Sequence, residues 1–66
     1  MFDLRTLLEA AETGSWQFAS DSKLADMASS CNRILQHDNL SKQNFDKIRV
    51  LLNRIEKAVE AQRAVK

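Results

Sequence analysis

Few residues in this chain have types that could perform chemistry: one cysteine, one histidine and an adjacent aspartate, with serines nearby. His37 and Asp38, with those serines, invite a hydrolytic interpretation. A working triad also needs a shaped pocket and a set of oxyanion donors. A chain of 66 residues has little room for either. We therefore interpret His37 and Asp38 as a polar turn between helices and expect no enzymatic activity.

Cys31 has two interpretations, as a reactive thiol (nucleophile or redox sensor) or as a small buried side chain. It falls on an apolar stripe with Leu24, Ala28 and Leu35, where a buried small side chain is expected. Cys31 and His37 are six residues apart, which places them on different faces of a helix. One Cys and one His cannot complete a tetrahedral zinc site. We favour the core interpretation and expect neither a metal nor a cofactor.

The charges separate along the chain although the net charge is only +1. Residues 1–40 carry three basic and six acidic side chains, and residues 41–66 carry seven basic and three acidic ones. A basic helix can contact phosphate, but here acids are interleaved with the cations, and the helix-turn-helix signature is missing. We interpret the basic half as a solvated face and expect no nucleic-acid partner.

Helical periodicity, together with helix-terminating residues, predicts three helices, over about 3–12, 21–37 and 41–64. Asp3 and Ser41 stand at N-cap positions, and Gly14 suits a left-handed C-cap. Residues 15–20 are ambiguous between a connector and the start of the second helix. Within them, Trp16 and Phe18 are either interface anchors or side chains that close a small core.

The third helix repeats apolar residues in a 3-4 pattern for about two heptads, like a short coiled-coil seam, formed by Phe45, Ile48, Leu52, Ile55 and Val59. Only a short polar link separates it from the second helix, which makes the two antiparallel neighbours. We predict a single all-α domain over residues 1–66: an antiparallel helical hairpin preceded by a short N-terminal helix.

A two-helix hairpin cannot bury all the apolar side chains on these helices. Chains this small usually need a disulfide, a metal or a partner chain for stability, and one cysteine excludes an internal disulfide. We expect a protein partner or self-association, unless the N-terminal helix already covers the surplus surface. The residues predicted to bind a partner are those at the edges of the seam: Met27, Ile34, Val50, Leu51 and Ala58.

The hairpin resembles a known family. The run Cys31-Asn32-Arg33-Ile34-Leu35, followed by Phe45, Ile48, Ile55-Glu56 and Ala58, is similar to the small co-chaperones of type III secretion needle subunits. The similarity covers about residues 24–60. It implies a virulence-associated helper that stabilises a tetratricopeptide-like chaperone, which holds a needle subunit monomeric. The turn here is one residue longer than in the family, and the small residues or prolines usual near it are missing.

The resemblance implies a bacterial protein, and a single cysteine is typical of the cytoplasm. No stretch approaches the roughly 18 apolar residues of a membrane span. We therefore expect a cytoplasmic location. The alternative function is a small helical dimeric regulator or inhibitor, of phage or plasmid type, that acts on a host protein.

Overall fold

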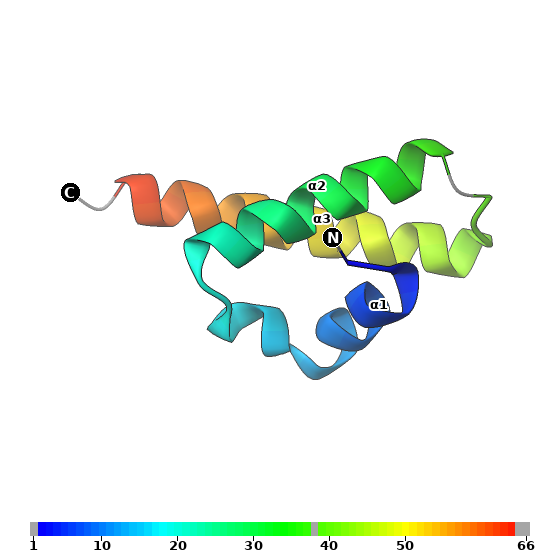
Figure 1. The fold of residues 1–66 in the computed structure, drawn as a ribbon, viewed down its shortest axis with the longest axis horizontal. Helices are drawn as coiled ribbons and strands as arrows, with labels where there is room; N and C mark the ends of the chain where they lie inside the picture. The colour runs from blue at the N-terminus through cyan, green and yellow to red at the C-terminus, as the bar shows by residue number, and fades with distance from the viewer. Residues whose placement is uncertain (1, 38, 65–66) are drawn as a thin grey trace.

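The fold is an antiparallel helical hairpin with a shorter helix packed across one side of it (Figure 1). The structure, a computed structural model, describes residues 2–37 and 39–64. Its elements in chain order are α1 (Leu4–Thr13), the 3-10 helix η1 (Ser15–Phe18), α2 (Asp21–His37) and α3 (Lys42–Ala64). The predicted all-α class is confirmed, and the predicted helix bounds differ from these by one residue at most. The ambiguous segment is a short 3-10 helix.

The two ends of α1 are set by the residues expected to cap it. The Asp3 carboxylate accepts a hydrogen bond from the backbone N–H of Thr6 at 2.8 Å. Side-chain and backbone hydrogen bonds with Thr6 lower the pKa of Asp3. At the other end Gly14 has φ +75°, a left-handed conformation that glycine adopts without a steric penalty, and its N–H donates to the Ala10 carbonyl at 2.9 Å. The chain therefore turns sharply out of α1 into η1.

Serine hydroxyls cap the two longer helices. The hydroxyl of Ser20 accepts from the N–H of Lys23 at 3.4 Å, and that of Ser41 accepts from the N–H of Asn44 at 3.3 Å. At the open end of the hairpin, the Gln62 side-chain amide, oriented to donate, bonds the Asp21 carboxylate. This bond joins the end of α3 to the start of α2, as an antiparallel pair requires.

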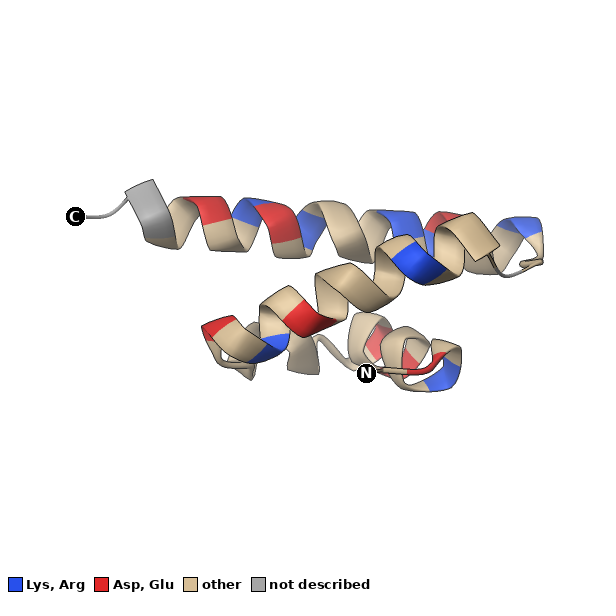
Figure 2. Ribbon diagram, turned by 45° about the horizontal axis from the view of Figure 1, so that its top comes forward, with Lys and Arg blue, Asp and Glu red and all other residues tan. Residues whose placement is uncertain are grey.

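Each α-helix carries charges of both signs, but most of the basic side chains belong to α3 (Figure 2). Residues 3–26, which include α1, η1 and the start of α2, hold two basic and five acidic side chains, a net charge of −3. Helix α3 holds six basic and three acidic side chains, a net charge of +3. The asymmetry read from the sequence is therefore an asymmetry between segments on different sides of the fold.

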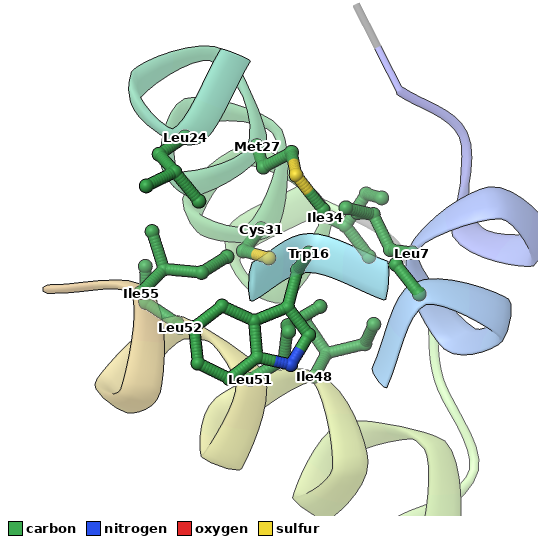
Figure 3. Packing of buried hydrophobic residues seen from close by; sticks show 11 residues of the cluster. Leu7, Trp16, Leu24, Met27, Cys31, Ile34, Ile48, Leu51, Leu52 and Ile55 are labelled. Atoms are coloured by element: carbon green, nitrogen blue, oxygen red, sulfur yellow. The ribbon is translucent and has the colours of Figure 1, made fainter. Parts of the chain in front are cut away.

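The core lies where α1, α2 and α3 meet, and η1 closes it (Figure 3). The side chains of Leu7, Cys31, Ile48 and Ile55 are fully buried. Trp16 of η1 is 9% exposed and belongs to the same cluster. The buried apolar residues that form this core are Leu7, Ala10, Trp16, Leu24, Met27, Cys31, Ile34, Ile48, Leu51, Leu52 and Ile55.

The buried faces of α2 and α3 are shifted from the predicted seam toward α1. Leu51, predicted to lie outside the seam, is 1% exposed. Phe45, predicted to lie in the seam, is 37% exposed, and this part of the prediction is wrong. It lies near the closed end of the hairpin, where Leu35 and Leu40 are only half-buried. The core is thick where three helices meet and thin where only two do.

A hydrogen bond to a buried hydroxyl holds the chain before α1 against α2. The backbone N–H of Phe2 donates to Ser30 Oγ at 3.1 Å, and Ser30 is 4% exposed. The bond gives this buried hydroxyl a partner and attaches the start of α1 near the middle of α2. Together with Trp16 at the other end, it holds α1 across the hairpin.

Candidate functional site

An open groove runs between α1 and α3, with a volume of about 350 Å³. Its apolar lining comes from Leu8 and Ala11 of α1, Trp16 of η1, and Val50 and Leu51 of α3. Charged side chains of both signs border it: Glu12 on α1, and Asp46, Lys47 and Arg54 on α3. We call this the α1–α3 groove.

Helical spacing and the turn at Gly14 together position the lining residues. On α3, Lys47, Val50 and Arg54 are three and four residues apart, so they form one row along the helix. On α1, Leu8 and Ala11 lie on the side next to the inward-facing Leu7. The groove therefore has two helical walls.

Two apolar side chains, one on η1 and one on α3, are exposed to solvent. Phe18 of η1 is 90% exposed and Val50 is 48% exposed. Phe18 borders a second groove of about 370 Å³, together with Glu9 and Lys23. Trp16 lines both grooves, so Phe18 lies only two residues from the lining of the first.

The structure separates the five residues predicted to bind a partner. Met27, Ile34 and Leu51 are buried in the core of the chain itself. Val50 is exposed in the α1–α3 groove, and Ala58 is half-buried. The prediction left open whether the N-terminal helix covers this surface. It does so for three of the five, and in this conformation those three are not accessible to a partner.

Leu8 and Ala11 of α1 were not among the residues predicted to bind a partner, and they form one wall of the groove. Trp16 and Phe18 were treated as a pair with two possible roles, and the structure gives each a different one: Trp16 is buried and Phe18 is exposed. Their spacing of two is the available signal, because residues two apart do not share a face of a 3-10 helix.

Among the described residues, Cys31 and His37 lie in different environments and do not share a site. Cys31 is fully buried, and burial raises the pKa of its thiol to about 11, so it remains protonated and unreactive at neutral pH. His37 is exposed in the last turn of α2. Asp38 lies outside the described residues. Within residues 2–37 and 39–64, no group of three or more His, Cys, Asp or Glu side chains is placed to hold a metal ion.

The described part of the chain contains no helix that is both long enough and apolar enough to cross a membrane. Comparison with protein-family models, with curated proteins and with solved structures finds no match to this chain.

Proposed function

We propose that this protein is a non-enzymatic helper that binds another protein through the α1–α3 groove. The observation that carries the proposal is an apolar groove, bordered by exposed Val50, on a chain whose reactive side chains are buried or scattered. An apolar groove between two helices is the kind of surface into which an amphipathic helix docks.

The groove favours an amphipathic helix over a small polar molecule. Small-molecule sites present a few convergent polar groups that await a ligand. The charged side chains of the α1–α3 groove, Glu12, Asp46, Lys47 and Arg54, are all exposed at its border and do not converge within its apolar lining. A groove with apolar lining and a border of both charge signs suits a helix that inserts apolar side chains at i, i+3 and i+4 and keeps its charged side chains at the edge.

The resemblance to the co-chaperones of type III secretion needle subunits supplies the specific partner. By that resemblance, the partner is a tetratricopeptide-like chaperone, built from helices, that holds a needle subunit monomeric in the bacterial cytoplasm. Cys31, Ile34, Ile48 and Ile55, which carry part of the resemblance, are all core residues. The resemblance therefore supports the hairpin through its packing positions.

The test is affinity purification of the tagged chain from its native host, with quantitative mass spectrometry. Val50→Glu places a charge in the groove, which is costly to bury in a complex. It should preserve the fold, because Val50 is half-exposed and glutamate is the better helix former. The matched control is Asn53→Glu, which adds the same charge to an exposed position of α3 that does not line the groove.

We expect a tetratricopeptide-like chaperone and a needle subunit to co-purify in stoichiometric amounts with the wild type and with Asn53→Glu, and to be lost with Val50→Glu. A stoichiometric partner of a different class would overturn the co-chaperone assignment. Equal recovery with both variants would overturn the assignment of the groove.

A second candidate, the small helical dimeric regulator, is favoured by a separate observation. Phe18 is almost fully exposed on a segment whose charge is opposite to that of α3.

A further inference from the structure

The charged side chains at the border of the α1–α3 groove are balanced in number but not in position. On α3, Lys47 and Arg54 are seven residues apart, which places them about 10.5 Å from each other along the helix axis. Val50 lies between them, three residues after Lys47 and four before Arg54. The exposed apolar side chain of the α3 wall therefore has a cation on either side of it.

Helical geometry places these two cations on the groove side of α3 and the acid of the same wall on the outer side. Successive residues are rotated by about 100° around the helix axis. Lys47 and Arg54 therefore fall between the buried Leu51 and the exposed Val50. Asp46 falls beyond Val50, farther from Leu51. A helix that lies in the groove meets the two cations before it meets Asp46.

The opposite wall carries a charge of the other sign. Glu12 of α1 lines the groove, four residues after Leu8 and therefore on the same side of the helix. Glu12, Lys47 and Arg54 are all exposed, so a bound helix can reach their charged groups without burying them completely. Where they face the groove, the α3 wall is therefore basic and the α1 wall acidic.

We propose that the partner of this groove is an amphipathic helix whose two flanks carry opposite charges. One flank has acidic side chains seven residues apart, which pair with Lys47 and Arg54, and the other has a basic side chain that pairs with Glu12. Its apolar face lies between the flanks and contacts Val50. The inference rests on the proposed function, because it specifies the partner of the same groove. Flanking charges of this kind select which helices pair and in which orientation.

The first measurement compares three synthetic helical peptides of three heptads with the same leucine face. One has glutamate on both flanks, one has lysine on both, and the split peptide has glutamate on one flank and lysine on the other. Binding to the full chain is followed by calorimetry and by the emission of Trp16, which lines the groove. At low salt we expect the split peptide to bind about threefold more tightly than the all-glutamate peptide and about tenfold more tightly than the all-lysine peptide. Half-molar salt should reduce these differences, because it screens exposed charges.

The second measurement exchanges the sign of the α3 wall. Lys47→Glu combined with Arg54→Glu makes both walls acidic, so the all-lysine peptide should become the tightest and the all-glutamate peptide the weakest. The matched control is Lys42→Glu combined with Arg49→Glu. It changes the same residue types at the same spacing, at exposed positions of α3 that do not line the groove, and it should keep the wild-type order. All four positions are exposed, so both double variants should fold, and circular dichroism verifies this.

Val50→Glu separates failure of this inference from failure of the proposed function. If no peptide binds the wild type, or if Val50→Glu leaves binding unchanged, the groove is not a helix site, and the proposed function and this inference fail together. If Val50→Glu abolishes binding but the three peptides bind the wild type equally, this inference fails alone. It also fails alone if the Lys47→Glu, Arg54→Glu variant keeps the wild-type order of affinities.

Discussion

Leu51 and Val50 are adjacent on α3, and the structure gives them opposite surroundings. Leu51 is 1% exposed in the three-helix core, whereas Val50 is 48% exposed in the groove. Truncating each to alanine therefore tests whether α1 and η1 are packed on the hairpin as described. If the hairpin stood alone, both residues would lie outside its seam, and both substitutions would reduce the stability of the fold only slightly.

The expected cost of Leu51→Ala follows from its position. Leucine-to-alanine changes in cores cost about 2–5 kcal/mol, depending on the cavity that remains. Leu51 also borders the groove, so water or the neighbouring Trp16 can partly fill the space, and we expect about 3 kcal/mol. Domains of this size have a total stability of roughly 3–10 kcal/mol and lose about 4–8 °C in melting temperature per kcal/mol. The melting temperature should therefore fall by about 12–24 °C.

Val50→Ala should change stability by less than about 0.5 kcal/mol. The side chain is half-exposed, so truncation loses little apolar burial, and alanine is the better helix former. The small loss of burial and the small gain in helix propensity nearly cancel. The experiment is thermal unfolding of the wild type and both variants, followed by far-UV circular dichroism for helicity and by fluorescence for Trp16. The chain contains one tryptophan, so its emission reports on the packing of η1 alone.

The emission of the wild type should be that of a buried tryptophan. Its unfolding transitions by circular dichroism and by fluorescence should coincide, as they do for a cooperative unit. Equal melting temperatures for Leu51→Ala and Val50→Ala would refute the packing of α1 and η1 on α3. Fully solvent-exposed tryptophan emission in the folded wild type would refute it independently.

Three further predictions concern single positions. Gly14→Ala should destabilise the fold by about 1–2 kcal/mol in chemical unfolding, because a φ of +75° strains any residue with a side chain. The added Cβ would meet Gln17 at an ordinary 3.6 Å, so the cost comes from the backbone and not from a clash. Gly14→Asn should lose less stability, because asparagine tolerates the left-handed conformation. Ser30→Ala should cost about 1 kcal/mol by leaving the Phe2 N–H without its partner, whereas Ser29→Ala at an exposed position should be neutral. The raised pKa of Cys31 predicts that the unfolded state releases a proton near pH 9.0 and the folded state only near 11, so stability falls as the pH rises through this window, by up to about 3 kcal/mol. A Cys31→Ala variant with the same pH dependence of stability would contradict this.

The helix ends could be predicted from the sequence because they depend on local chemistry. Asp3 and Ser41 supply capping oxygens to N–H groups three residues ahead, and Gly14 adopts a conformation that other residues avoid. These interactions operate within one helical turn and need no tertiary partner. The pairing of α2 with α3 was also predictable, because a short link leaves two amphipathic helices few other arrangements.

The positions that are covered and those that stay open were decided by tertiary structure. Apolar residues occupy more than half of the circumference of α3, so periodicity alone could not distinguish Leu51, which is buried, from Phe45, which is not. The decision depends on where α1 lies, and the Gly14 turn, the packing of Trp16 and the Phe2–Ser30 bond set that position. Periodicity tells which residues share a face of a helix. The neighbour that covers the face is set by contacts between segments far apart in the chain, and the same contacts leave Val50 and Phe18 exposed.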